Sequence, residues 1–252
     1  MNNEMNCLSY WFPKIVGIPG IKTPRTEIVQ TKLPLWSLCD GKAPEPTDGE
    51  TWHGFLDGLA EIAMRVGGGG PVFMRTGQGS GKHEWRDTCF IGDATRETIG
   101  QHVCQLVEWS ELVDMLGLPT NVWVIRELLP TKPVFTAFRG MPITKERRYF
   151  IKDGKTVCRH PYWPAEAFEG RSQAPAGWRD ALEVMNNPTL EEWAELTELS
   201  DRVGAVIGGD WSIDWLMTER GWYLTDMAVA GDSYHWAGCA KAELFARSEV
   251  VE

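Results

Sequence analysis

The stretch PVFMRTGQGSGKHEWRDTCFI, residues 71–91, places a glycine-rich loop between two apolar segments. It predicts a hairpin with a long tip, formed by a strand over 72–75 and a return strand around 88–91. Glycines let backbone N–H groups approach phosphate oxygens closely, and Arg75 and Lys82 would supply positive charge. The competing interpretation is a solvated hairpin tip with ordinary surface charges, since short glycine motifs often occur without a ligand.

The loop does not satisfy the P-loop pattern. Counting back from Gly81 and Lys82, the first glycine of that motif would fall on Thr76, and His83 stands where a serine or threonine should hold magnesium. A P-loop also opens directly into a helix, whereas the residues after Lys82 predict a strand. A P-loop NTPase is therefore the least favoured function.

The charge and the N-terminus limit the possible partners. The formal net charge of −10 argues against binding to bulk nucleic acid, which needs a broad cationic surface. The chain has no basic start followed by a long apolar run, and no window approaches ~20 uncharged apolar residues. We expect a soluble cytoplasmic protein without a membrane or bulk nucleic-acid partner, and the sequence does not indicate its oligomeric state.

Cysteines and histidines show no metal-binding pattern. The six cysteines are scattered without a close pair, so they predict neither a zinc site nor a disulfide framework, and we expect them to be reduced and mostly buried. His53, His102 and His235 are expected to be structural. His83 is expected to be a solvated loop residue, although it could touch phosphate. His160 and Tyr162 could line an acceptor pocket or simply pack in the core or a loop.

Strands and helices alternate along the rest of the chain. Prolines and glycines predict short strands and loops over residues 8–42. Apolar residues at helical spacing predict helices that end near Gly67 and Gly117, and the capping box of Thr189 and Glu192 predicts another.

The second half of the chain is rich in strands. NVWVIRELL, residues 121–129, predicts a strand, and Asp153-Gly154 predicts a hairpin turn. A last hairpin over 211–229 is expected to turn at residues 219–221. Strand clusters flanked by helices predict an α+β fold in two lobes, with the boundary near residues 129–130.

Two aspartates interrupt the apolar strands of that last hairpin. Asp214 lies in WSIDWLM and Asp226 in WYLTDMA. Burying an unpaired carboxylate costs several kcal/mol, so each aspartate requires a cation, a metal or a set of donors. On adjacent strands they could converge on Mg²⁺, which accepts one or two carboxylates together with phosphate oxygens. The alternative is that they pair structurally with arginine or lie at strand ends in water.

Other parts of a nucleotide site follow in order. Residues 127–129 could present backbone groups to an adenine edge, with the side chain of Arg126 or Glu127 reaching polar atoms nearby. Glu146 and Arg148 lie two apart and so share one face of a strand.

Together these segments resemble the ATP-grasp superfamily, and within it the small phage and bacterial clade that is distinguished by arginines beside the lysine. The matching segments are WFPKIVGIPGIKTPRTEIV, VFMRTGQGSGKHEWRDTCFI, VWVIRELLP, ERRYFIKDGKTV and WSIDWLMTERGWYLTDMA. The resemblance implies an N-terminal segment over 1–69, a smaller lobe with the glycine loop over 70–129, and a larger lobe with the metal hairpin over 130–252. It also implies a cytoplasmic protein of a bacterium or of a phage-infected host cell.

The resemblance further implies an ATP- and Mg²⁺-dependent ligase that joins a carboxylate to an amine through an acyl-phosphate. Its substrates would be small molecules or peptides. The implied roles, carried over by position, are phosphate binding by Arg75, Gly79, Ser80, Gly81 and Lys82, adenine binding by Arg126, Glu127, Leu128 and Leu129, phosphate or carboxylate binding by Arg148, and metal binding by Asp214 and Asp226. Arg148, Lys82 and Arg75 would be the catalytic residues.

One position departs from the family. Ala228 stands where the family usually has asparagine, two residues after the second metal acid. The site would then hold one metal, use Asp232 as a ligand, or have lost turnover. The last case implies the alternative function, a module that binds ATP to clamp or assemble a protein partner without ligation.

Overall fold

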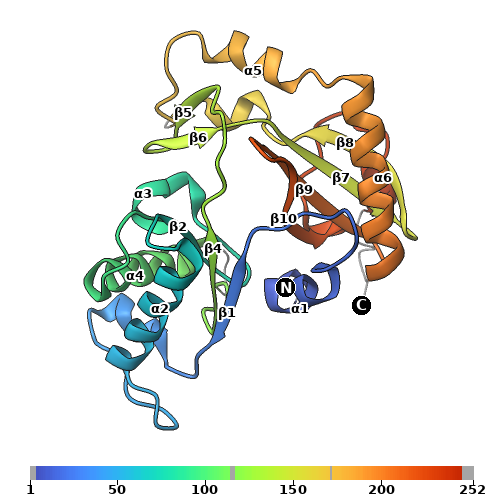
Figure 1. Ribbon diagram of the computed structural model, residues 1–252. Helices are drawn as coiled ribbons and strands as arrows, with labels where there is room; N and C mark the ends of the chain where they lie inside the picture. The colour runs from blue at the N-terminus through green and yellow to red at the C-terminus, as the bar shows by residue number, and fades with distance from the viewer. Residues whose placement is uncertain (1–3, 114–116, 171, 246–252) are drawn as a thin grey trace, which may run out of the picture.

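The computed structural model describes residues 4–113, 117–170 and 172–245. Two four-stranded antiparallel sheets form the two lobes of an α+β fold, as predicted (Figure 1). The first sheet has the order β1-β4-β2-β3 and consists of β1 (Thr26–Gln30), β2 (Val72–Thr76), β3 (Phe90–Ile91) and β4 (Val122–Glu127). The second has the order β10-β9-β7-β8 and consists of β7 (Glu146–Lys152), β8 (Lys155–Pro161), β9 (Trp211–Thr218) and β10 (Gly221–Val229).

Two helices cover one face of the first sheet. They are α2 (Trp52–Gly67) and α4 (Arg96–Val113), which bury Phe55, Leu59 and Val103 against the sheet. Thr51 caps α2, since its side chain accepts a hydrogen bond from the Gly54 N–H at 3.1 Å. Both helices were predicted from their apolar spacing, and the position of Gly117 after α4 is consistent with that prediction.

The second sheet is covered by α6 (Leu190–Ile207), whose Leu196 and Val203 pack on it. The predicted cap is present, because the Thr189 hydroxyl accepts a hydrogen bond from the Glu192 N–H at 3.1 Å. The predicted turn between β7 and β8 is also present. Asp153 and Gly154 both adopt positive φ, 49° and 77°, as a tight hairpin turn requires.

Smaller elements complete the chain. A two-stranded sheet of β5 (Phe135–Ala137) and β6 (Met141–Ile143) and the helix α5 (Trp178–Asn186) lie at the end of the second lobe that faces α3 (Trp85–Thr88) (Figure 1). The 3-10 helices are η1 (Glu4–Asn6), η2 (Leu35–Asp40), η3 (Lys82–Glu84), η4 (Ala165–Phe168), η5 (Ala230–Asp232) and η6 (Ala242–Phe245). Within the described ranges, no helix is both long and apolar enough to cross a bilayer.

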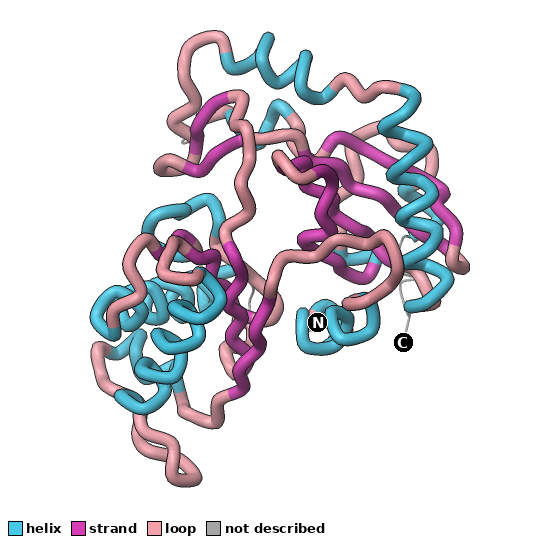
Figure 2. The backbone as a smooth tube through the Cα atoms, in the orientation of Figure 1, coloured by secondary structure: helices cyan, strands magenta, loops and turns pink. Residues whose placement is uncertain are grey.

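A short helix, α1 (Leu8–Ile15), lies where we expected only strands and loops. Leu8, Trp11, Phe12 and Ile15 recur at helical spacing and are all buried, which outweighs the presence of Pro13 inside the helix. These side chains belong to one core cluster with β4 and with the second sheet. The helix therefore packs between the lobes, beside β1 and β10 (Figures 1 and 2).

The glycine loop is not the open hairpin tip that we predicted. Residues 82–88 form η3 and α3, and the return strand is limited to β3. Trp85 and Thr88 lie one helical turn apart and both are buried, so helical rather than strand geometry satisfies them. The loop is also well packed, because a Cβ at Gly79 would overlap the Trp109 ring.

We predict that Gly79→Ala destabilises the protein by about 1–3 kcal/mol, the usual cost of overpacking a close contact. Gly58→Ala is the matched control. Gly58 lies within α2, and a Cβ there would meet no neighbouring atom within 4 Å. That change should stabilise the fold by about 0.5–1 kcal/mol, because alanine favours a helix over glycine. Urea unfolding measures both, and equal effects of the two substitutions would contradict this packing role for Gly79.

Candidate functional site

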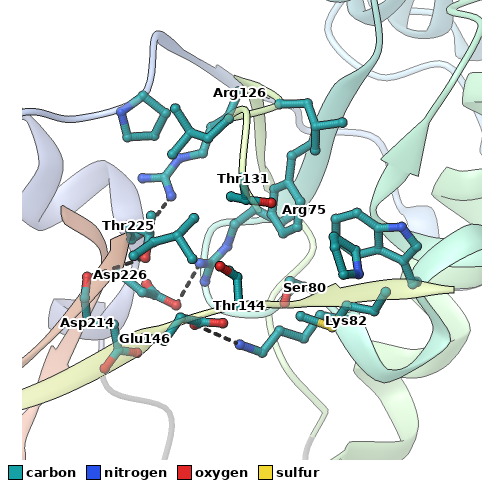
Figure 3. A pocket seen from close by; sticks show the side chains of 18 of the residues that line it. Arg75, Ser80, Lys82, Arg126, Thr131, Thr144, Glu146, Asp214, Thr225 and Asp226 are labelled. Atoms are coloured by element: carbon teal, nitrogen blue, oxygen red, sulfur yellow. Dashed lines mark hydrogen bonds and ion pairs between the residues drawn. The ribbon is translucent and has the colours of Figure 1, made fainter. Parts of the chain in front are cut away.

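A cavity of about 190 Å³ lies between the lobes. It is lined from both sides, by β2, the glycine loop and β4 of the first lobe and by β7, β9 and β10 of the second (Figure 3). The predicted site residues that line it are Arg75, Ser80, Lys82, Arg126, Glu127, Leu128, Leu129, Asp214 and Asp226. Gly79, Gly81 and Arg148 do not line it; Arg148 instead binds Asp214.

The two aspartates face each other directly. Asp214 on β9 and Asp226 on β10 are partners in the strand register. Arg148 donates two hydrogen bonds to Asp214, at 2.7 and 2.8 Å, and Arg75 donates one to Asp226 at 2.8 Å. Each carboxylate is therefore paired with an arginine here, which is the alternative that the sequence left open.

Arg75 also changes the proton affinity of its partner. Partial burial favours the neutral form of Asp226, but the charges of Arg75 and Arg126 outweigh this and lower its pKa. Asp226 is therefore ionised at neutral pH. Because Arg75 belongs to the first lobe and Asp226 to the second, this ion pair crosses the cleft.

Lys82 forms a second contact across the cleft. Its Nζ lies 3.7 Å from Glu146 Oε2 and 4.0 Å from the centre of the Tyr162 ring. Burial opposes the charged form of Lys82, but the nearby Glu146 carboxylate and Tyr162 outweigh it and raise the pKa. The Trp163 Nε1–H donates to the other oxygen of Glu146 at 2.9 Å. Lys82 is thus held as a cation at a fixed place.

Arg126 is the least satisfied charge of the site. Its side chain is 4% exposed and donates through Nη1 to the Thr225 carbonyl. Among the described residues, its Nε and Nη2 have no hydrogen-bond partner. Burial and the neighbouring Arg75 lower the pKa of Arg126 to about 9, so the guanidinium stays charged at neutral pH. A buried cation without an anion costs several kcal/mol, and an anionic ligand here would remove that cost.

Part of the cavity wall is apolar. Phe73, Trp85, Leu128 and Met141 line it beside Leu129. Glu127 is already engaged, because its N–H donates to the Arg25 carbonyl at 3.0 Å and its carboxylate lies 3.2 Å from Arg25 Nε. Leu128 and Leu129 follow β4 outside any strand and lie at the cavity wall.

Some residues of the cavity were not among the predicted site residues. Glu146 and Tyr162 meet Lys82. The sequence indicated that Glu146 shares a strand face with Arg148 and left open that Tyr162 could line an acceptor pocket. Thr144 and Thr225 also line the cavity, and no motif marks them.

Several other candidates lie outside the cavity. Asp232, proposed as a replacement ligand, is exposed and accepts a hydrogen bond from Asn6 at 2.8 Å. His83 is exposed and stacks on Phe138 at 4.3 Å between ring centres. His102 is buried, with Nδ1 3.0 Å from the Thr88 carbonyl oxygen, in agreement with the predicted structural role.

Comparisons with known proteins support the fold. The sequence matches no known protein family and no curated protein. Among solved structures, the chain is similar to Cdc123 from Schizosaccharomyces pombe, with a TM-score of 0.55 and 11% identity over 91% of this chain and 86% of that one.

Two further likenesses are weaker. D-alanine–D-alanine ligase from Bacillus anthracis has a TM-score of 0.47 and 12% identity over 90% of this chain and 56% of that one. A RimK domain protein of ATP-grasp type from Sphaerobacter thermophilus has a TM-score of 0.45 and 10% identity over 90% and 59%. The chain thus spans little more than half of these two proteins, and at such identities the likeness concerns the fold alone. The two-lobed α+β architecture agrees with the predicted fold class.

We predict that the Arg75–Asp226 pair stabilises the fold in a pH-dependent way. The folded-state pKa of Asp226 lies below its ordinary value, so the pair contributes above about pH 3.9 and is lost as the pH falls through the lower folded pKa. Asp226→Asn should therefore cost about 1–2 kcal/mol near pH 6, a modest value because the Asp226 side chain is 39% exposed. The cost should shrink toward zero as the pH falls below the lowered folded-state pKa of Asp226.

Urea unfolding over this pH range measures the difference. Asp93→Asn, at an exposed loop position, is the control and should have little effect at any pH. A cost of Asp226→Asn that stays constant as the pH falls would contradict the account of the pair.

Proposed function

We propose that the protein is an ATP- and Mg²⁺-dependent ligase that joins a carboxylate to an amine. The observation that carries the proposal is Arg126, a buried guanidinium with two unpartnered nitrogens among the described residues, beside Arg75 at the edge of the cavity. Lys82 adds a further cation from the glycine loop. Three cations around one cavity suit a triphosphate, and two adjacent carboxylates suit its metal.

The cavity suggests a direction for the nucleotide. The adenine would lie against the apolar part of the wall, at Phe73, Leu128 and Leu129. The phosphates would lie toward Lys82 and Arg126, close to the packed loop of Gly79, Ser80 and Gly81. The sequence assigned Arg126 to adenine binding. We assign it to phosphate binding instead, because its side chain points toward Thr225 on β10 (Figure 3).

Binding would exchange one set of ion pairs for another. Arg75–Asp226 and Lys82–Glu146 now cross the cavity, whose 190 Å³ is below the roughly 300–1,000 Å³ of ligand sites. Arg75 and Lys82 would then bind the phosphates in place of their present carboxylate partners. Asp226 and Asp214 would bind the metal. We infer that the lobes part to admit the nucleotide and that the charges released from each pair are compensated by Mg·ATP.

The proposed reaction has two steps. A carboxylate oxygen attacks the γ-phosphorus and releases ADP, and the amine nitrogen then attacks the acyl carbon, loses a proton and releases phosphate. Arg75, Lys82 and Arg126 would stabilise the charge on the transferred group, and Arg148 would position Asp214 or bind the substrate carboxylate. Bound Mg²⁺ would supply further neutralisation of the phosphates. The substrates, small molecules or peptides, and the cytoplasmic location of a phage or bacterial protein remain predictions.

A second candidate is an ATP-binding clamp that assembles a protein partner without ligation. Ala228 favours it, because a methyl group cannot provide the ligand oxygen of the asparagine usual in the family. Ala228 lies on β10 opposite Ser212, two residues beyond Asp226.

We predict that Arg126→Met and Lys82→Met each weaken ATP binding at least tenfold. Each removes a charge-assisted hydrogen bond, worth about 1.5–3 kcal/mol or roughly 10–150-fold in affinity. Isothermal titration with ATP and Mg²⁺ measures the change. Lys42→Met, at an exposed position outside the cavity, is the control and should bind like the unmodified protein. Equal affinity for ATP in all three variants would contradict a phosphate site in the cleft.

We also predict that ADP and phosphate are released only when ATP, Mg²⁺, a carboxylate and an amine are all present. Mixed carboxylate and amine candidates are screened by ADP release, and Asp214→Asn should abolish it while retaining the circular-dichroism spectrum of the folded protein. The clamp instead predicts ATP-dependent thermal stabilisation, of order RT ln(1 + [ATP]/Kd), without ADP. If ATP causes neither thermal stabilisation nor turnover, both functions are contradicted.

A further inference from the structure

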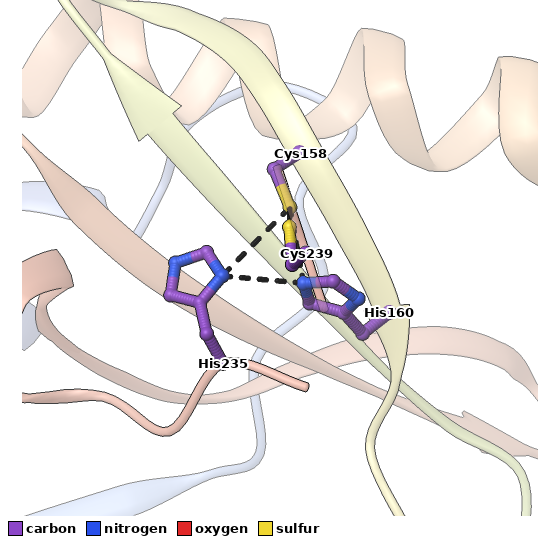
Figure 4. A group of neighbouring side chains, drawn as sticks. All are labelled: Cys158, His160, His235 and Cys239. Atoms are coloured by element: carbon purple, nitrogen blue, oxygen red, sulfur yellow. Dashed lines mark hydrogen bonds between the residues drawn. The ribbon is translucent and has the colours of Figure 1, made fainter. Parts of the chain in front are cut away.

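Four potential metal ligands converge at one place outside the nucleotide cavity. The ligand atoms of Cys158, His160, His235 and Cys239 all lie within 4.8 Å of one another (Figure 4). The sequence showed no close cysteine pair and gave His235 a structural role. The sequence therefore predicted no zinc site, whereas the fold brings Cys158 Sγ and Cys239 Sγ to 3.3 Å from each other.

The fold explains how these residues meet. Cys158 and His160 are two apart on β8, so alternation points both to the same face of the second sheet. His235 and Cys239 are four apart in the segment after η5, which returns over that face (Figure 4). About 75 residues separate the two halves, and hence no spacing rule for neighbouring ligands reveals the cluster.

The distances match a tetrahedral zinc site. With Zn–S near 2.3 Å and Zn–N near 2.0–2.1 Å, the edges of a tetrahedron measure roughly 3.3–3.8 Å. Cys158 Sγ lies 3.0 Å from His160 Nε2 and 4.0 Å from His235 Nδ1, and the two imidazole nitrogens are 3.3 Å apart. Small movements of the side chains would place a metal ion at bonding distance from all four atoms.

The surroundings favour a neutral, enclosed centre. Phe150 stacks on His235 with ring centres 3.6 Å apart, Phe245 lies 5.5 Å from the same ring, and Trp236 is parallel to His160. Two thiolates, two neutral imidazoles and one Zn²⁺ sum to zero charge, so this aromatic shell would not enclose a net charge. All four ligand atoms, two sulfurs and two imidazole nitrogens, are of the kinds that Zn²⁺ binds and Mg²⁺ disfavours.

We propose that Cys158, His160, His235 and Cys239 form a structural Zn²⁺ site. Four protein ligands leave no open position, which distinguishes a structural site from a catalytic one. Binding releases the two thiol protons as the thiolates form. The site joins the segment after β10 to the edge strand β8.

The position of the site gives it a role in the fold. His160 is the register partner of Arg148, which is in turn the partner of Asp214. The metal would thus fix the chain from η5 to η6 over the face of the sheet that carries Arg148 and Asp214. The inference stands independently of the proposed ligase function, since neither ATP nor a substrate enters it.

Metal analysis of the full-length chain tests the site. Protein produced in zinc-supplemented medium should contain about one Zn²⁺ per chain by mass spectrometry. The double variant Cys158→Ala/Cys239→Ala should contain at least tenfold less zinc per chain. Cys104→Ala is the matched control, since Cys104 is also half-buried but lies on α4, and it should retain the metal. Replacement by Co²⁺ should give the intense visible bands of tetrahedral thiolate coordination.

A second measurement covers the case in which the double variant does not fold. In the unmodified protein, Cys158 and Cys239 should resist alkylation until a chelator removes the zinc, whereas the exposed Cys39 should react throughout. Three results would overturn the proposal: substoichiometric zinc without thiolate bands on Co²⁺ addition, an unchanged zinc content in the folded double variant, or a Cys158–Cys239 disulfide in place of the metal.

Discussion

The structure depends on charge compensation across the cleft. Arg75 and Lys82 from the first lobe meet Asp226 and Glu146 from the second. Unpaired, each of these partly or fully buried groups would cost several kcal/mol, so the lobes are held together where a nucleotide would enter. The same arrangement leaves Arg126 without a carboxylate partner among the described residues. Arg126 is therefore the cation of the cleft that an anionic ligand would neutralise.

The packing of the chain supports this arrangement. α1 packs between the lobes through Trp11 and Phe12, and the Arg126 guanidinium lies 5.6 Å from the Phe12 ring. The buried side of α1 thus forms part of the surroundings of the unpaired cation. At the far end of the second sheet, the cluster of Cys158 and Cys239 holds the last described segment near the strand that carries Arg148. Both contacts connect segments that are distant in the sequence.

Local signals predicted much of the fold. The cap at Thr189 and the Asp153-Gly154 turn are decided by neighbouring residues, and each is present as predicted. The convergence of Asp214 and Asp226 also follows from one hairpin. The sequence failed where long-range packing decides the outcome. Burial of Trp85 and Thr88 turned the expected return strand into a helix, and burial of the apolar face of α1 produced a helix despite Pro13.

Long-range contacts also explain what the sequence could not show of the sites. The partners of the two aspartates come from β2 and β7, so no local pattern reveals that each acid already has an arginine. The direction of Arg126 toward β10 and the meeting of two cysteines 81 residues apart depend on the assembled fold in the same way. A crystal structure with Mg²⁺ and a non-hydrolysable ATP analogue tests the central claim most directly. The account predicts triphosphate oxygens bound to Lys82 and to the free nitrogens of Arg126, with the Arg75–Asp226 pair separated. An analogue bound elsewhere, with both ion pairs still closed across an empty cleft, would contradict it.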